Sequence, residues 1–424
     1  MAQRHMDRLT SFDTSFLANE KANGHMAIGA LLMCEGSAPD PDDFLAHIRS
    51  RVHQLPRLRQ RLLYPPLGLG TPFWVDYPDF DIHQHLSRVT LPSPGTEAQF
   101  RELVGELLAP PLDRSKPLWE LIVVEGFEDD RFAIVYKTHH AMADGISAVD
   151  IGMLLFDVEP RPEPSREEAA WDPRRSPSRL GLLGRALSGV WATLGRLGRW
   201  LRRAAEDPAR ARRRASDGLA GLWEVTWNLA RPAPRVPGRL LARRLGPRLR
   251  GPLPVGIADP VERLGAVSAA MDALKASKQP LGAEAIWGLN DWFRDFAPPV
   301  LLAPTAAINF STRLFNLLVT NFPGPQMAFY VLGRELTGVY PIGFLAHRHA
   351  LAIAILSYNG KVGFGLLADP DALPDAERLT EHLAASVEEL KAAAAQVASP
   401  SADGNELAGD DRPRFARARE LAGE

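Results

Sequence analysis

Apolar and polar positions follow two different periods along this chain. The apolar runs at 121–127 and 132–137 flank the acidic turn 128–130, which predicts an antiparallel hairpin. A second hairpin is predicted at 351–358 and 361–367, because the intervening Asn359-Gly360 is a preferred two-residue turn. A closing helix should follow, since apolar residues then recur at helical spacing at Leu379, Leu383, Val387 and Leu390. These elements predict an α/β protein with mixed sheets.

The middle of the chain carries a longer helical pattern. Residues 174–250 hold 19 Arg, no Lys and four acids, a balance of +15, whereas the net charge of the whole chain is −2. We therefore expect a basic amphipathic helix, followed by further apolar and basic residues. Its apolar face comprises Leu183, Leu187, Val190, Leu194, Leu197 and Leu201, and its other face Arg185, Arg196, Arg199 and Arg203.

Two interpretations of this helix remain open. With the tryptophans at 191, 200, 223 and 227, it suits the headgroup region of an anionic membrane. It equally suits a crossover helix that packs its leucine face on a lobe and solvates its arginines. Binding to nucleic acid is disfavoured, because the aromatics lie among leucines and no known nucleic-acid module surrounds them.

Composition narrows the class of protein. The single cysteine, Cys34, excludes an intrachain disulfide, suits a reducing compartment and is expected to be buried. The start of the chain has no apolar core after its positive charges, and no run of about 18 apolar residues follows elsewhere. We therefore expect a cytoplasmic protein without a membrane span.

The candidate chemistry lies at 136–145, where an apolar strand ends in two histidines. A histidine can take a proton from an alcohol and return it to a leaving group near neutral pH. Because neighbouring strand residues point to opposite faces, only one of His139 and His140 can face a reactive cavity. Asp144 could anchor the following loop or fix an imidazole tautomer, and Gly145 permits a tight turn.

The histidine pair also has two other interpretations. Two adjacent histidines are often ordinary polar residues at the end of a strand. A metal site formed by one of them with Asp144 is disfavoured, because no further His or Cys cluster lies nearby.

The flanking sequence favours catalysis. The run from His139 to Gly145 resembles the His-His-x-x-x-Asp-Gly motif of coenzyme A-dependent acyltransferases, and its surroundings resemble the bacterial wax ester synthase/diacylglycerol acyltransferase family. The resemblance covers roughly residues 8 to 158 and 235 to 395. It rests on the segments Leu9–Asp13 with Phe16, Pro56–Arg59, Phe80–His85, Leu91–Gly95, Pro111–Glu120, Thr320–Pro325 and Val339–Pro341.

The resemblance implies a two-lobed, chloramphenicol acetyltransferase-like fold with mixed sheets and a helical crossover. We expect an N-terminal lobe at 1–160 and a linker with the basic helices at 161–250. A C-terminal lobe at 251–397 and a disordered tail at 398–424 should follow.

It also implies an activity, the esterification of a long-chain alcohol or diacylglycerol to wax ester or triacylglycerol. The co-substrate would be acyl-CoA, with no metal or prosthetic group. His140 would be the general base, and His139, Asp144 and Gly145 would hold its loop. The protein would lie peripherally on the inner membrane or on lipid droplets. Substrate-binding residues would be Pro117, Leu118, Trp119, Asn321, Pro323 and Gly324.

One segment departs from the family pattern. Family members usually carry a long stretch between the counterparts of Pro247 and Ile257, and here only residues 248–256 bridge the two. The first part of the C-terminal lobe is therefore expected to be missing, which leaves two hypotheses. One is the enzyme just described, and the other is a catalytically silent lipid-surface protein that retains the fold.

Overall fold

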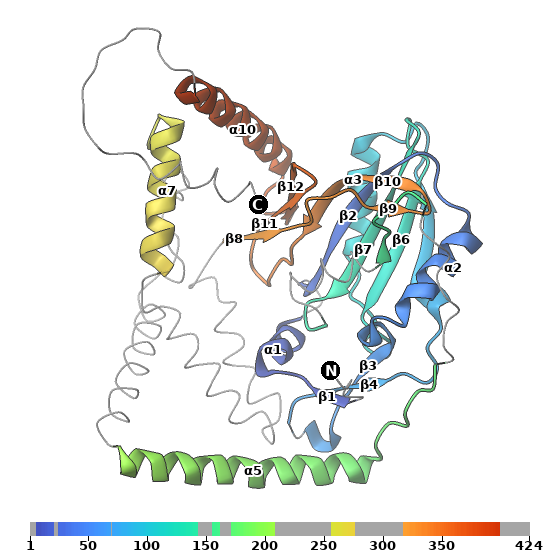
Figure 1. The fold of residues 1–424 in the computed structure, drawn as a ribbon, viewed down its shortest axis with the longest axis vertical. Coiled ribbons are helices and arrows are strands. Elements are labelled where there is room, and N and C mark those ends of the chain that lie inside the picture. The colour runs from blue at the N-terminus through green and yellow to red at the C-terminus, as the bar shows by residue number, and fades with distance from the viewer. Residues whose placement is uncertain are drawn as a thin grey trace.

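The computed structural model describes residues 6–20, 24–68, 70–142, 155–161, 171–207, 256–275 and 317–398. Two main β-sheets stand side by side, and helices lie around them (Figure 1). The expected disordered tail at 398–424 lies almost wholly outside the described residues, as does most of the expected linker before residue 171.

A six-stranded mixed sheet forms the larger body. Its strand order is β5 (Leu86–Thr90), β6 (Trp119–Glu125), β7 (Arg131–His139), β2 (Ala27–Glu35), β10 (Arg334–Ile342) and β9 (Tyr330–Val331). Strands β5 and β6 run parallel, and the other neighbours are antiparallel. Strands β6 and β7 are the first predicted hairpin, which is confirmed. The mixed sheet agrees with the predicted fold class.

Strand β10 comes from the C-terminal part of the chain yet completes this sheet. It pairs with β2 from Leu336 opposite Cys34 to Ile342 opposite Gly29, with a register shift after Leu336. Cys34 is buried and free, as predicted. The N-terminal and C-terminal parts of the chain are therefore joined by backbone hydrogen bonds.

The second sheet has three strands, ordered β12 (Lys361–Ala368), β11 (Leu351–Tyr358) and β8 (Leu317–Pro323). Strands β11 and β12 form the second predicted hairpin, and its turn residues Asn359 and Gly360 have positive φ angles of 44° and 74°. Strand β8 runs parallel to β11.

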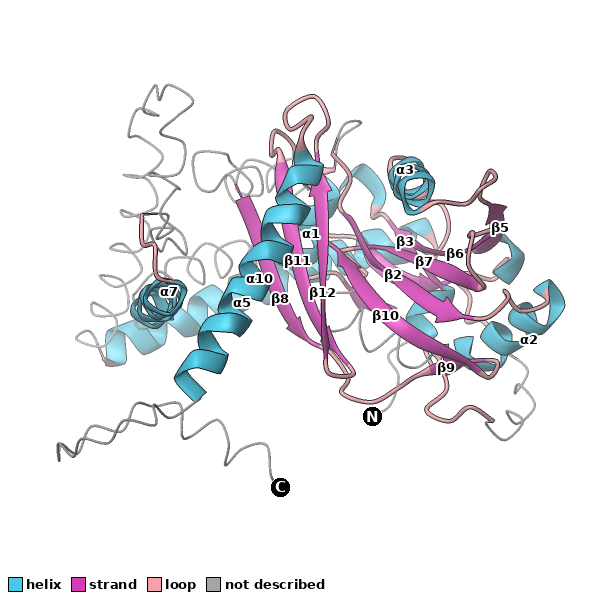
Figure 2. Cartoon of the chain, turned by 90° about the horizontal axis from the view of Figure 1, so that it is seen from above, coloured by secondary structure: helices cyan, strands magenta, loops and turns pink. Residues whose placement is uncertain are grey.

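The two sheets meet where β12 packs on β10, which Figure 2 shows from above. Glycines make this approach possible. A Cβ atom at Gly363 would lie 2.0 Å from the carbonyl oxygen of Val339, and one at Gly365 would lie 1.6 Å from that of Pro341. Both distances are far shorter than real contacts allow, so only glycine fits there.

Both faces of the larger sheet are buried, so β7 reads as a continuous apolar run rather than an alternating one. Successive side chains of β7 nevertheless point to opposite faces of the sheet. Phe132, Ile134 and Tyr136 join the main core, whereas Ala133 and Val135 pack with Phe100 and Val104 beneath a helix. That helix is α3 (Glu97–Leu108), which begins at a capping box formed by Thr96 and Gln99.

A buried lysine closes the other end of α3. The Lys137 ammonium donates to the carbonyl oxygens of Leu107 at 2.9 Å and Pro110 at 2.7 Å. A cation at this position satisfies carbonyls that the helix leaves without partners and interacts favourably with the helix dipole. The charge is therefore accommodated although Lys137 itself is buried.

The remaining described helices are α1 (Ser11–Asn19), α2 (Pro41–Val52), α5 (Arg179–Glu206), α7 (Pro260–Lys275) and α10 (Ala376–Ala398). Helix α10 is the predicted closing helix, and α5 contains the predicted basic amphipathic segment. A small sheet of β1 (Met6–Arg8), β4 (Phe73–Asp76) and β3 (Gln60–Leu63) lies beside α5. Among the described helices, none has the length and apolarity needed to cross a membrane.

Helix α5 is attached to the body near its first turn. Leu182 is buried there against Phe73 and Val75 of β4. Beyond this contact the helix extends along one edge of the molecule (Figure 1). Two of its large apolar side chains are exposed, Leu180 to 80% and Trp191 to 75%.

Candidate active site

Strand β7 ends at the histidine pair, and hydrogen bonds on both sides fix the backbone there. The His139 N–H donates to the carbonyl oxygen of Leu118 at 3.0 Å, and the His140 N–H donates to that of Met26 at 2.8 Å. The pair is thus held between the segments that precede β6 and β2. Local backbone motion at His140 is restricted by this pairing.

His139 is fully buried and faces the end of α1. Its Nδ1 accepts a hydrogen bond from the Ala141 N–H at 3.0 Å, so the proton of the neutral ring lies on Nε2. Nε2 is 3.6 Å from Oε1 of Glu20. His139 therefore connects the loop that carries His140 to a carboxylate on α1's C-terminal side.

Glu20 is held in turn by Arg114. The Nε and Nη2 atoms of Arg114 lie 3.0 and 2.6 Å from Oε2 of Glu20, and Nη2 also donates to the Leu17 carbonyl at 2.8 Å. Burial alone would raise the pKa of Glu20, but hydrogen bonds and charges from His139 and Arg114 outweigh it and lower that pKa to about 2. Glu20 is therefore ionised throughout the physiological range.

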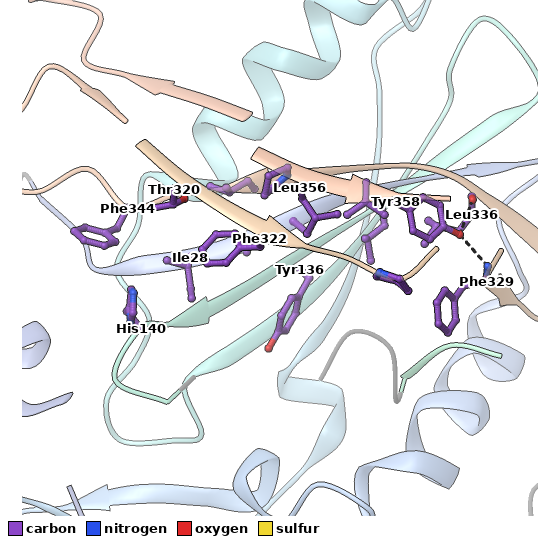
Figure 3. A pocket seen from close by; sticks show the side chains of 18 of the residues that line it. Ile28, Tyr136, His140, Thr320, Phe322, Phe329, Leu336, Phe344, Leu356 and Tyr358 are labelled. Atoms are coloured by element: carbon purple, nitrogen blue, oxygen red, sulfur yellow. Dashed lines mark hydrogen bonds between the residues drawn. The ribbon is translucent and has the colours of Figure 1, made fainter. Parts of the chain in front are cut away.

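His140 lies on the lining of an elongated cavity, at one end of it (Figure 3). Its ring stacks on Phe16 of α1, with centroids 3.9 Å apart and planes at 11°. Phe344 approaches edge-on, with centroids 5.3 Å apart and planes at 80°. These two aromatic contacts limit the orientations that the imidazole can adopt.

The cavity lies between the two main sheets and its walls are mainly apolar. One wall is formed by residues of β2, β7 and β10 of the larger sheet, and the other by residues of β8 and β11 of the smaller sheet. The polar side chains in the lining are His140, Tyr136, Thr320 and Tyr358. Apolar lining residues include Ile28, Leu32, Phe322, Leu336, Phe344 and Leu356.

The segment Pro117–Trp119 is not part of this lining. All three residues are buried, and the indole N–H of Trp119 donates to the carbonyl oxygen of Leu58 at 2.8 Å. The Leu118 carbonyl accepts from the His139 N–H and from the Thr138 hydroxyl at 3.1 Å. This segment therefore touches the site through its backbone, which supports His139.

In the C-terminal segment Thr320–Pro325, the residues that line the cavity alternate along the strand with the residues that the sequence predicted to bind substrate. On β8, Asn321 and Pro323 are exposed, while Thr320 and Phe322 line the cavity. Gly324 allows close packing, because a Cβ there would lie 2.1 Å from the carbonyl oxygen of Ser357. The period of two along a strand was the signal that would have selected Thr320 and Phe322.

Asp144 and Gly145 lie outside the described residues. The partners of His139 that the structure does describe, Glu20 and the Ala141 N–H, were not anticipated. Arg114 stands within the segment Pro111–Glu120 and Glu20 just after the segment that contains Phe16, but nothing in their spacing indicates an ion pair.

This arrangement is suited to proton transfer in an environment that excludes water. An imidazole is presented at the end of an apolar channel, its backbone fixed and its ring between two aromatic rings. Within the described residues, no group of three or more His, Cys, Asp and Glu side chains is arranged to hold a metal ion. The geometry fits a general base acting on a substrate with a long apolar chain.

Comparisons with known proteins agree with this chemistry. The family model for the wax ester synthase/diacylglycerol acyltransferase catalytic domain matches residues 9–293, and the model for the C-terminal domain of the same family matches residues 249–391. The wax ester synthase/diacylglycerol acyltransferase from Marinobacter aquaeolei VT8 has the same fold. Its TM-score is 0.58 at 23% identity, over 92% of this chain and 100% of that chain.

Among curated relatives, "Probable diacylglycerol O-acyltransferase tgs1" of Mycobacterium tuberculosis H37Rv is 30% identical over 448 residues, covering 91% of this chain and 96% of the relative. "Probable diacylglycerol O-acyltransferase tgs3" of the same strain is 40% identical over 186 residues, covering 43% of this chain and 68% of the relative.

The first of these alignments also compares the lengths of the two proteins. It extends over 448 residues, more than the 424 of this chain, although only 91% of the chain takes part. The relative therefore carries residues with no counterpart in this chain. Both family domains are nevertheless matched. The chain belongs to the wax ester synthase/diacylglycerol acyltransferase family and is an O-acyltransferase of that type.

Proposed function

We propose that this protein transfers the acyl group of an acyl-CoA to a long-chain alcohol or a diacylglycerol, with His140 as the general base. The observation that supports this most directly is the position of His140 at one end of an apolar cavity between the two sheets. The names of the relatives, which are diacylglycerol O-acyltransferases, support an acyl acceptor of this kind.

The reaction needs one base. His140 removes the proton of the acceptor hydroxyl, and the oxygen attacks the carbonyl carbon of the thioester. The tetrahedral intermediate collapses with cleavage of the C–S bond, and the coenzyme A thiolate takes the proton from the His140 imidazolium. The apolar walls favour an alcohol over water as the nucleophile, because water is excluded from the cavity.

The other motif residues have supporting roles in this proposal. His139, braced by Glu20, positions the backbone of the catalytic loop, and we assign Asp144 and Gly145 to the same loop. The segments Pro117–Trp119 and Asn321–Gly324 flank the substrate channel.

The test of the base is coenzyme A release from palmitoyl-CoA, with hexadecanol or dioleoylglycerol as acceptor. We expect His140→Ala to lower acceptor-dependent release by about 10²- to 10⁴-fold. His382→Ala, at an exposed position on α10, is the matched control and should retain activity. Both variants should unfold at nearly the wild-type temperature.

Two results would count against the proposal. An unchanged rate in His140→Ala would exclude His140 as the base. Absence of release by the wild-type protein with either acceptor would favour the alternative, a catalytically silent lipid-surface protein that retains the fold.

We also propose that α5 binds the surface of an anionic membrane or a lipid droplet. Its exposed Leu180 and Trp191 and its excess of arginines support this location. The proposal predicts sedimentation with phosphatidylglycerol vesicles that weakens with added salt. Charge reversal at the exposed Arg199 and Arg202 should reduce it further. Vesicle binding that is unchanged by added salt and by charge reversal would contradict the proposal.

A further inference from the structure

The cavity between the sheets differs at its two ends. Figure 3 places His140 at one end and Phe329, Leu336 and Tyr358 at the other. His140 is partly exposed, so a substrate can approach the imidazole from that side. The three residues at the far end are each less than a tenth exposed. The cavity is therefore a blind pocket with the candidate base at its mouth.

Hydrogen bonds fix the far end of this pocket. The Tyr358 hydroxyl accepts from the Phe329 N–H at 2.8 Å and donates to the Leu336 carbonyl oxygen at 3.0 Å. The phenol thus joins β11 to the segment before β9 and to β10. These three lining residues cannot move apart without leaving buried polar groups unpaired.

A fourth aromatic or apolar side chain, Phe156, reaches the same end from the segment that follows the histidine motif. Asp157 and Tyr330 exchange two backbone hydrogen bonds of 2.8 Å each, as in an antiparallel pair. The residues that precede them, Phe156 and Phe329, both line the cavity. Both rings are therefore presented at its closed end.

Polar groups of α2 hold this segment in place. Arg51 forms an ion pair with the carboxylate of Asp157, which is only 3% exposed, and Arg51 Nη1 donates to His47 Nδ1 at 3.0 Å. The proton of the neutral His47 ring therefore lies on Nε2, which donates to the Leu155 carbonyl oxygen at 3.0 Å. The residues on both sides of Phe156 are thus anchored, and its ring cannot retreat without breaking buried interactions.

The pocket is long enough for one hydrocarbon chain. Its lining on β10 extends from Leu336 to Ile342, six steps along an extended strand, or about 20 Å. The hydrocarbon core of a bilayer is about 30 Å thick and contains two opposed chains, so one such chain reaches about 15 Å. A chain of this class with its reactive group at His140 therefore extends to the aromatic end.

Resting on the proposed function, we infer that Phe156 and Phe329 set the longest hydrocarbon chain that the pocket accepts. The chain belongs to the acyl thioester or to the alcohol acceptor, since each has its reactive group at His140 and its chain beyond. Affinity should rise about fourfold with each added methylene while the chain still gains apolar contact. It should stop rising once the terminal methyl meets the two rings, because overfilling a packed apolar site is unfavourable.

Binding of unreactive probes tests this without turnover. One series consists of S-alkyl coenzyme A thioethers from decyl to docosyl, and the other of free 1-alkanols of the same lengths, each titrated into the full-length protein. In Phe156→Ala, the first chain beyond the wild-type limit should bind about fourfold more tightly. In Phe156→Trp, the longest chain that the wild-type protein accepts should bind about fourfold more weakly. Shifts in opposite directions distinguish a change of pocket depth from a general loss of stability.

Val158→Ala is the matched control, because Val158 lies on the same segment but is 59% exposed and outside the lining. It should leave both series unchanged. A limit that moves in the thioether series identifies the measured chain as the acyl chain, and one that moves in the alkanol series identifies it as the acceptor's. Affinity without a limit in both series, or a limit that stays at the same length in both Phe156 variants, would overturn the inference. Failure of the acyltransferase proposal would appear separately, as absence of coenzyme A release from palmitoyl-CoA by a protein whose chain-length limit still moves.

Discussion

Glu20 links α1, Arg114 and the buried His139, and removing its charge allows this network to be measured. Glu20→Gln keeps the shape of the side chain and an oxygen facing His139, but it removes the ion pair with Arg114. The fall of the Glu20 pKa from its ordinary 4.5 to about 2 corresponds to about 3 kcal/mol of stabilisation. Its side chain is only 8% exposed, so screening by solvent is limited.

This value is an upper bound for the substitution. Part of the lowering depends on positive charge at His139, whose Nδ1 accepts a hydrogen bond from the Ala141 N–H in the structure. We therefore expect Glu20→Gln to lower the free energy of unfolding at pH 7 by about 1–3 kcal/mol. Urea unfolding followed by tryptophan fluorescence measures it. Glu128→Gln, at an exposed position, is the control and should change stability little.

The sign of the pH dependence follows from the direction of the pKa change. A carboxylate whose pKa is lowered by folding stabilises the native state above pH 4.5, and this contribution is lost as the pH falls toward 2. Glu20 alone should cost the wild-type protein about 0.7 kcal/mol between pH 5 and pH 4. Glu20→Gln should lack that component. Equal stability of the two proteins at pH 7, with the same loss below pH 5, would refute the assigned ion pair.

Two further substitutions test how the sheets and α3 are held. Lys137→Met should lower the free energy of unfolding by about 3 kcal/mol, because it leaves two carbonyl oxygens at the end of α3 without their donor. An unchanged midpoint of urea unfolding would contradict this expectation. Gly365→Ala should separate β12 from β10, because its Cβ would lie 1.6 Å from the carbonyl oxygen of Pro341. It should therefore lower the thermal midpoint of unfolding far more than the control Gly105→Ala, whose Cβ meets no neighbour within 4 Å. Similar midpoints for the two alanine variants would refute this account of the contact between the sheets.

Local patterns were the most reliable guide to this fold. Asn359-Gly360 specified its hairpin because both residues adopt positive φ angles at little steric cost. The end of β7 was recognised from the histidine motif, and His140 lies on the cavity lining. In both cases the signal that the sequence offers is a run of adjacent residues, although the cavity around His140 is built from distant parts of the chain.

Contacts between distant parts of the chain were not predictable in this way. Glu20 and Arg114 are separated by 94 positions, and many acidic and basic residues would have satisfied the same charge rule. The pairing of β10 with β2 spans an even longer separation, and one sequence contains no signal for such a register. In the C-terminal segment, the family motif drew attention to Asn321 and Pro323, whereas the position of their neighbours Thr320 and Phe322 on the cavity lining depends on the facing sheet.

The insertion of β10 into the larger sheet affects how this protein could be divided or opened. A fragment that ended before residue 317 would leave β2 with an unpaired edge, which invites association with other chains. The N-terminal half is therefore not expected to behave as an autonomous folding unit. In the intact protein, β12 of the smaller sheet packs closely on β10 of the larger one through Gly363 and Gly365, so a rigid-body separation of the two sheets would break this contact. A long substrate must enter by threading along the cavity or by local parting of β8 and β11 from β2 and β7, so access to His140 should depend on side chains at the ends of the channel rather than on a hinge.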